Sequence, residues 1–135
     1  MIDVVVADDQ DLYRVGMVGI LAVAHNVRIV GQAESPAQLL KTLKRAKPHV
    51  LILSTRFVPA LQQFQRMLER RKTALLVLAE DNDQTAYMDW LRAHGIVYRS
   101  IDEPALVDAV RRVARGELFV QERSSDARED TSEVA

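Results

Sequence analysis

Residues 2–9 read Ile2-Asp3-Val4-Val5-Val6-Ala7-Asp8-Asp9, a short apolar run that ends on two adjacent carboxylates. The run is rich in β-branched residues, which favour β-strands. A strand with so few polar residues is typical of a parallel sheet that helices cover on both faces. Ligands of open parallel sheets bind at the carboxyl ends of the strands, so the acidic pair marks the first place to look for a site.

Short apolar runs and amphipathic segments alternate along the rest of the chain and predict five strand-helix units. The expected strands are Ile2–Ala7, Val27–Ala33, His49–Leu53, Ala74–Ala79 and Gly95–Tyr98. The expected helices carry the apolar stripes Val18/Leu21/Ala22, Leu39/Leu40/Leu43, Leu61/Phe64/Met67/Leu68, Tyr87/Met88/Leu91 and Leu106/Val107/Val110/Val113. The predicted fold class is α/β, a doubly wound five-stranded parallel sheet.

Composition narrows the functional classes. The 135 residues contain 48% hydrophobic residues, enough for one domain with a core, and no cysteine, which excludes disulfides, thiol catalysis and thiolate zinc sites. The 18 basic and 19 acidic residues leave a net charge of -1, so we expect DNA binding only through a domain outside this chain. No apolar run approaches the roughly 20 residues that span a bilayer, and the start lacks a basic leader. We expect a cytoplasmic protein without a membrane partner.

The composition becomes polar after Val120. Residues 1–120 are the predicted domain, and residues 121–135 are predicted to be a polar linker or tail, because they contain too few apolar side chains to order themselves.

The adjacent carboxylates Asp8 and Asp9 permit two interpretations. They would hold a hard divalent cation if a third oxygen ligand lay nearby. Alternatively, they cap the helix that follows the first strand, which is a common role for aspartate at that place. The pair alone does not decide between these readings.

The segment Val4-Val5-Val6-Ala7-Asp8-Asp9-Gln10-Asp11-Leu12-Tyr13-Arg14-Val15-Gly16 is similar to the opening of CheY-like receiver domains, notably the NarL/FixJ group. The likeness continues in Ile29–Ala33, Pro48–Leu53 and Val107–Glu117, and it covers about residues 1–120. This resemblance implies a flavodoxin/CheY-like fold with strand order 2-1-3-4-5. It also implies a response regulator that acts in two-component signalling and transcription regulation.

Receivers of this family accept a phosphoryl group on an aspartate at the end of the third strand, with Mg²⁺ held by the acidic pair. The chain has Ser54 at that position, and a hydroxyl cannot form an acyl phosphate. Ala79 stands where the family has Thr or Ser, Arg99 stands where it has Lys, and Ile96 stands where an aromatic residue is usual. The resemblance therefore predicts a pseudo-receiver with a degenerate phosphorylation site at Asp8, Asp9, Ser54, Ala79 and Arg99. Its Mg²⁺ binding should be weak at best.

The surviving carboxylates need a partner, because two adjacent buried carboxylates repel each other. Our hypothesis is that Arg99, Arg56 or both pair with Asp8 and Asp9 in the place of the metal and lock one conformation. The alternative is that both arginines point to solvent and the aspartates only cap the helix.

Without phosphorylation chemistry, function should lie on a surface. Receivers commonly dimerise through the fourth helix, fifth strand and fifth helix, where this chain has Trp90, Tyr98, Arg111 and Arg112, residue types enriched at binding hot spots. The alternative is a half-buried Trp90 and solvated arginines. A second candidate surface lies around Tyr13, Val15 and Met17 on the first helix.

Two functions of different class remain. The first is the regulatory half of a transcription factor that acts by phosphorylation-independent interaction or dimerisation, with a helix-turn-helix domain outside this chain. The second is a stand-alone adaptor or decoy in two-component signalling. A homodimer is expected, and a sensor kinase or another signalling protein is a further expected partner. No enzymatic activity and no cofactor are expected, because His25, His49 and His94 have no evident nucleophile partner.

Overall fold

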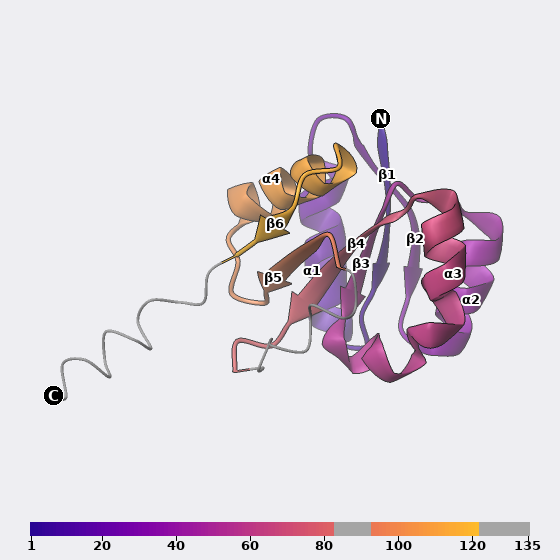
Figure 1. The fold of residues 1–135 in the computed structure, drawn as a ribbon. Helices are drawn as coiled ribbons and strands as arrows, with labels where there is room; N and C mark the ends of the chain where they lie inside the picture. Colours follow the sequence, from indigo (N-terminus) through magenta and orange to yellow (C-terminus); the bar gives the residue numbers. More distant parts are fainter. Residues whose placement is uncertain (83–92, 122–135) are drawn as a thin grey trace, which may run out of the picture.

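The computed structural model describes residues 1–82 and 93–121, and within them the chain folds around one parallel sheet. Six strands are hydrogen-bonded in the order β2-β1-β3-β4-β5-β6 (Figure 1). The strands are β1 Ile2–Ala7, β2 Val27–Ala33, β3 Val50–Ser54, β4 Ala74–Ala79, β5 Gly95–Tyr98 and β6 Phe119–Val120. The helices are α1 Asp11–Ala22, α2 Pro36–Arg45, the 3₁₀-helix η1 Thr55–Ala60, α3 Gln62–Arg71 and α4 Glu103–Ala114.

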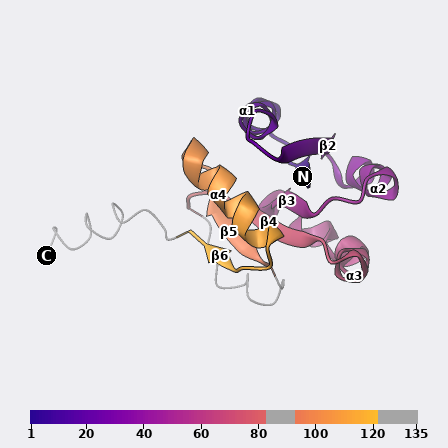
Figure 2. The ribbon, with the colours of Figure 1, turned by 90° about the horizontal axis from the view of Figure 1, so that it is seen from above.

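The helices cover the sheet in two pairs. Helices α1 and α4 lie on one face, and α2 and α3 lie on the other (Figure 2). Successive side chains of a strand point to opposite faces, so each central strand supplies both cores. Val5 and Leu51 belong to the cluster with α2 and α3, whereas Val4 and Ile52 belong to the cluster with α1 and α4. This explains why the strands are apolar at nearly every position.

Helices α2 and α4 begin at residues whose side chains cap the helix N-terminus. Ser35 caps α2 by accepting a hydrogen bond from the backbone of Gln38 at 3.2 Å, and Pro36 occupies the first turn. Asp102 caps α4 by accepting from the backbone of Ala105 at 2.9 Å. Because β1, β3, β4 and β5 pair in parallel, their carboxyl ends lie at one edge of the sheet.

The prediction of a doubly wound parallel sheet is confirmed, but the prediction of five strands is wrong. A sixth strand, Phe119–Val120, pairs in parallel with β5, where Gly95 aligns with Phe119. A Cβ at Gly95 would lie 2.9 Å from the carbonyl oxygen of Phe119, so glycine permits this close approach. The backbone N–H of Gln121 also donates to Ile96 at 2.9 Å. Gln121, the first residue of the predicted tail, is therefore hydrogen-bonded to the sheet.

The predicted helices agree with the structure only in part. The first helix buries Met17 and Leu21, whereas Val18 is only partly buried and Ala22 is exposed, so its core face is rotated from the predicted one. The short 3₁₀-helix η1 was not expected. The predicted fourth helix, around Tyr87, lies outside the described residues.

Candidate functional site

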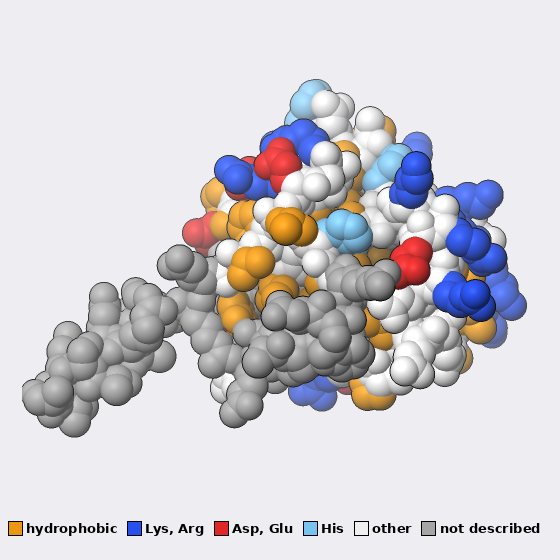
Figure 3. All heavy atoms as spheres, viewed as in Figure 1, with side chains coloured by type: hydrophobic (Ala, Val, Ile, Leu, Met, Phe, Trp, Pro, Cys, Tyr) orange, Lys and Arg blue, Asp and Glu red, His pale blue; other side chains and the backbone are white. Residues whose placement is uncertain are grey.

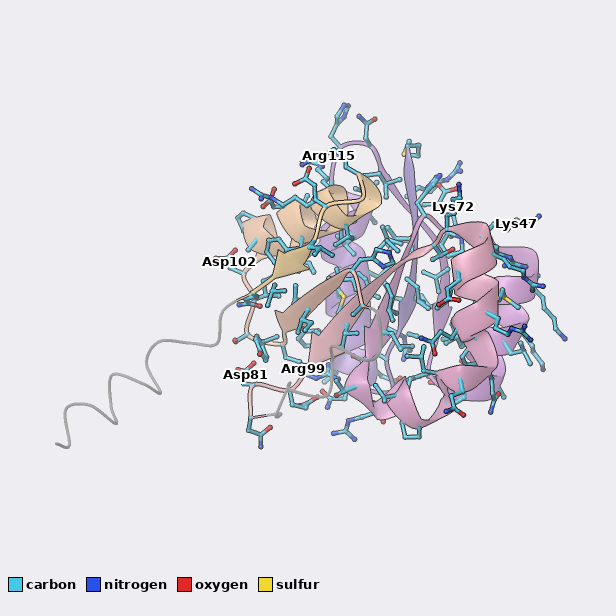
Figure 4. All side chains as sticks on the ribbon, in the orientation of Figure 1. Lys47, Lys72, Asp81, Arg99, Asp102 and Arg115 are labelled. Atoms are coloured by element: carbon cyan, nitrogen blue, oxygen red, sulfur yellow. The ribbon has the colours of Figure 1, made fainter. Side chains whose placement is uncertain are left out.

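The residues of the predicted site meet at the carboxyl edge of the sheet. Asp8 follows β1, Ser54 ends β3 and Ala79 ends β4. Arg99 follows β5, and its backbone N–H donates to the carbonyl oxygen of Ala79 at 3.1 Å. Figure 4 shows Arg99 at this edge, near Asp81 in the loop after β4. The parallel topology thus brings together residues that are up to 91 positions apart.

A buried ion pair forms the centre of the site. The Nη1 of Arg99 donates to Oδ2 of Asp8 and its Nη2 donates to Oδ1, both at 2.8 Å. The Asp8 side chain is 0% exposed and that of Arg99 is 10% exposed. Two parallel charge-assisted bonds in this geometry are the strongest form of an arginine–carboxylate contact. Both oxygens of Asp8 are therefore engaged by the same guanidinium.

Arg99 contacts three further residues. Its Nε donates to the carboxylate of Glu80, and Nη2 lies 3.3 Å from Oγ of Ser54. The guanidinium carbon lies 4.7 Å from the ring centroid of Tyr13, within the range of a cation–π contact. The hydroxyl of Tyr13 also donates to the backbone carbonyl of Arg99 at 2.8 Å. The side chain is thus held from the directions of β1, β3, β4 and α1.

The electrostatics of the site follow from this arrangement. Burial alone would lower the pKa of Arg99, but its hydrogen bonds to Asp8 and Glu80 outweigh burial and raise that pKa. Burial raises the pKa of Tyr13 to about 12, against the opposing positive charge of Arg99 and with support from the nearby carboxylates. Arg99 stays a cation and Tyr13 stays a neutral phenol at physiological pH.

The second carboxylate is bound more loosely. Asp9 lies 3.6 Å from Nη1 of Arg56, and their side chains are 40% and 53% exposed. An exposed pair at this distance contributes little to stability. Ser54 accepts a hydrogen bond from the backbone N–H of Arg56 at 3.2 Å, so its hydroxyl oxygen caps η1. Both arginines of the hypothesis therefore lie beside the acidic pair, with Arg99 buried and Arg56 at the surface.

Sequence reasoning missed three contributors to the site. Glu80 directly follows Ala79 at a strand end, and the strand-end rule that singled out Asp8 would have found it. Arg14 donates through Nη1 to the backbone carbonyl of Asp8 at 2.7 Å. Tyr13 was predicted on a docking surface, but it packs against Arg99. Nothing in the local sequence signals the contacts of Arg14 and Tyr13.

The chemical repertoire of this site is narrow. Across residues 1–82 and 93–121, no cluster of three or more His, Asp or Glu side chains is arranged to hold a metal ion. Ser54 contributes a neutral hydroxyl in place of a third carboxylate, and Ala79 has no hydroxyl to donate. The arrangement is suited to holding strands together, and Asp8 cannot offer a free oxygen while Arg99 stays in place.

The predicted interaction face is only partly accessible. Trp90 lies outside the described residues. Tyr98 is 5% exposed and packs in the core beside α2 and α3, so its predicted place on a surface is wrong. Arg111 is half-buried and donates to the carbonyl of His25 at 2.6 Å, whereas Arg112 is exposed and pairs with Asp108.

The second predicted surface, on α1, also needs a correction. Met17 is 2% exposed and belongs to the core, whereas Val15 is 59% exposed.

The histidines have structural contacts. Nδ1 of His49 accepts from the backbone N–H of Asp3 at 2.9 Å, and Nδ1 of His94 accepts from that of Leu75 at 3.0 Å. Both lie at the amino edge of the sheet, away from Arg99, on the wall of a cavity of about 440 Å³. These rings support the backbone at strand starts.

No family model matches the chain, but comparisons with known proteins find relatives of similar sequence. The probable transcriptional regulatory protein NarL of Mycobacterium tuberculosis is 31% identical over 119 residues, which cover 84% of this chain and 55% of NarL. Response regulator GacA of Pseudomonas syringae is 29% identical over 126 residues, covering 89% of this chain and 58% of GacA. The described residues have the receiver fold and are similar to the receiver domains of NarL/FixJ/LuxR-type response regulators.

Solved structures agree on the fold of this receiver. The receiver domain of NarL from Mycobacterium tuberculosis superposes with a TM-score of 0.70 at 26% identity, covering 86% of this chain and 98% of that one. The receiver domain of RcsB from Salmonella enterica, solved with the phosphomimetic BeF₃⁻, gives a TM-score of 0.77 at 24% identity, with coverage of 93% and 96%. RcsB dimers bound to DNA give 0.78 at 24%, covering 93% of this chain and 66% of that one.

The chain spans only 52–59% of the length of its curated relatives. In the part of the receiver that the structure describes, no helix is both long and apolar enough to cross a bilayer.

Proposed function

We propose that this receiver is a pseudo-receiver, which acts by phosphorylation-independent protein–protein interaction or dimerisation. The observation that carries the proposal is the bidentate contact between Arg99 and Asp8 beside Ser54. The position of the phosphoacceptor has no carboxylate, and the carboxylate that would bind Mg²⁺ already has a cation as its partner. The receiver is therefore held in one state by its own side chains.

A comparison of charges supports this proposal. Mg²⁺ requires near-octahedral oxygen ligands at about 2.1 Å and gives up its bound water reluctantly. At this edge it would have to displace a buried guanidinium that also satisfies Glu80. Removing one partner of a buried pair costs several kcal/mol, and the neutral Ser54 offers little in return. Binding of Mg²⁺ should therefore be weak at millimolar concentration.

The same reasoning argues against enzymatic activity. A receiver that transfers a phosphoryl group to itself needs an acceptor carboxylate, and Ser54 would form a phosphate ester by a different reaction. Its hydroxyl oxygen accepts from Arg56 and lies within reach of Arg99, in a fully buried position. We propose a signalling role without catalysis or a cofactor.

The relatives favour a transcription factor as the whole protein. NarL is described as a transcriptional regulatory protein, and RcsB binds DNA as dimers. Because this chain covers little more than half of such relatives, a helix-turn-helix domain encoded beyond residue 135 is part of the proposal. A stand-alone adaptor or decoy that binds a sensor kinase is the alternative. The length of the natural reading frame distinguishes the two.

The decisive experiment exposes the chain to acetyl phosphate, or to beryllofluoride with Mg²⁺, beside an aspartate-containing receiver as a control. Intact mass, the fluorescence of Trp90 and the oligomeric state are measured before and after. We expect no adduct, no spectral change and an unchanged oligomeric state. A stoichiometric acyl adduct, or dimerisation that requires beryllofluoride, would overturn the proposal.

A further inference from the structure

Charge is distributed unevenly in this receiver, although its net charge is only -1. Residues 41–72 contain nine of the 18 basic residues and a single carboxylate, Glu69. Seven of these basic residues are exposed on or just after helices α2 and α3 and form what we call the basic face. Its members are Lys41, Lys44, Arg45, Lys47, Arg66, Arg70 and Lys72. The net charge therefore hides a strongly positive local surface.

The two helices present these cations as one surface. Helices α2 and α3 lie side by side on the same face of the sheet in both ribbon views (Figures 1 and 2). The guanidinium of Arg71 joins them, because its Nη1 donates to the backbone carbonyl of Leu43 in the last turns of α2. Lys47 and Lys72 lie at neighbouring ends of the helices (Figure 4), and blue side chains gather over this region in Figure 3.

The cations of the basic face differ from most arginines elsewhere in the receiver. Arg28, Arg112 and Arg115 each pair with a carboxylate at 2.8–2.9 Å. Within residues 1–82 and 93–121, none of the seven members of the basic face forms an ion pair with a carboxylate. The helix dipole favours cations in the last turn, as at Lys44 and Arg70. It gives no reason for Lys41 or Arg66, which lie earlier in their helices.

The composition of the face indicates its partner. None of the large hydrophobic residues exposed in the described structure belongs to residues 41–72. The face thus lacks the apolar anchors of a membrane-inserting helix and the aromatic hot spots of most protein interfaces. A dispersed array of arginine and lysine without stacking residues fits a regular array of phosphates. We propose that the basic face binds the phosphate backbone of double-stranded DNA without reading its sequence.

This contact would be made by the receiver itself, so it differs from DNA binding through a separate domain. It revises the expectation drawn from the net charge, because phosphates respond to the nearest cations. The Debye length is about 10 Å at 0.1 M salt, so carboxylates on distant faces are largely screened. The proposal does not depend on the state of Ser54 or Arg99.

The test measures the anisotropy of a labelled duplex of unrelated sequence with the 135-residue chain over a series of KCl concentrations. Two variants of equal net charge are compared, K44Q/R70Q on the basic face and R28Q/R115Q on other surfaces. All four side chains are exposed, so both variants should fold, which circular dichroism verifies. We expect K44Q/R70Q to lower the slope of log affinity against log salt by about two, and R28Q/R115Q to leave it unchanged.

Three results would overturn the proposal. The first is no binding of the duplex even at the lowest salt concentration. The second is an equal loss in both variants, which would indicate net charge instead of a defined face. The third is competition by poly-glutamate that is as effective as competition by unlabelled duplex of equal charge, which would identify an acidic protein segment as the partner.

Discussion

At the carboxyl edge of the sheet, Asp8 is fully buried and both of its oxygens accept hydrogen bonds from Arg99. On the basic face, seven exposed cations have no carboxylate partner among the described residues. Charges that satisfy each other inside a fold determine its conformation, whereas unpaired charges at a surface are available to another molecule. The comparison assigns a structural role to the first region and an external partner to the second.

The largest effect is expected when the buried pair is broken. R99A leaves the carboxylate of Asp8 buried without its partner, which should lower the free energy of unfolding by about 3–5 kcal/mol. Urea denaturation measures the change. R28A, which breaks the exposed pair with Asp3, should cost at most about 1 kcal/mol. Equal costs for R99A and R28A would mean that water or another side chain satisfies Asp8.

A second pair of variants examines whether Arg99 excludes the metal. S54D supplies the missing carboxylate, and R99K replaces the bidentate guanidinium with a compact ammonium that cannot bridge both oxygens of Asp8. We expect S54D/R99K to bind Mg²⁺ at least about tenfold more tightly than the natural chain, with S54D intermediate. Calorimetric titration measures the affinity. Equal affinities for S54D and S54D/R99K would show that Arg99 does not compete with the ion.

Tyr13 allows a smaller perturbation of the same edge. Y13F removes the hydrogen bond to the backbone carbonyl of Arg99 and should cost about 1 kcal/mol of unfolding free energy. Because the folded pKa of Tyr13 is raised from 10.0 to about 12, its contribution is present below pH 10 and is lost as pH rises toward 12. The ultraviolet absorbance of tyrosinate should show one transition near pH 12 that Y13F lacks. If the transition that Y13F lacks lies near pH 10 and not near pH 12, this assignment of a raised pKa to Tyr13 is wrong.

Much of the fold was predictable because the pattern of apolar residues indicates where the buried strands lie. Residues 2–7, 27–33, 74–79 and 95–98 are strands with the predicted bounds, since a buried parallel strand is apolar on both faces. The two-residue strand Phe119–Val120 escaped prediction because it is shorter than any periodic signal. It depends on Gly95 in the neighbouring strand, a long-range contact that no local pattern encodes.

The site was predictable only at the ends of strands. The strand-end rule singled out Asp8, the family resemblance added Ser54, Ala79 and Arg99, and the parallel topology explains why these residues share an edge. The directions in which long side chains point could not be predicted from the sequence. Tyr98 is buried although its residue type suggested a surface, and Tyr13 packs on Arg99 through an approach of α1 to the end of β5 that only the folded chain defines.

The smallest change in the free energy of unfolding is expected for variants of the basic face. A small change there and a large one at Arg99 would distinguish the two regions. K44Q/R70Q should change the free energy of unfolding by no more than about 0.5 kcal/mol, because neither side chain is buried or ion-paired among the described residues. A slight increase in stability is consistent with the relief of repulsion between neighbouring cations, and that increase should diminish when salt is added. Urea denaturation at two salt concentrations measures both quantities. A loss comparable to that of R99A would mean that these cations hold the fold together, and their unpaired state would no longer indicate a partner.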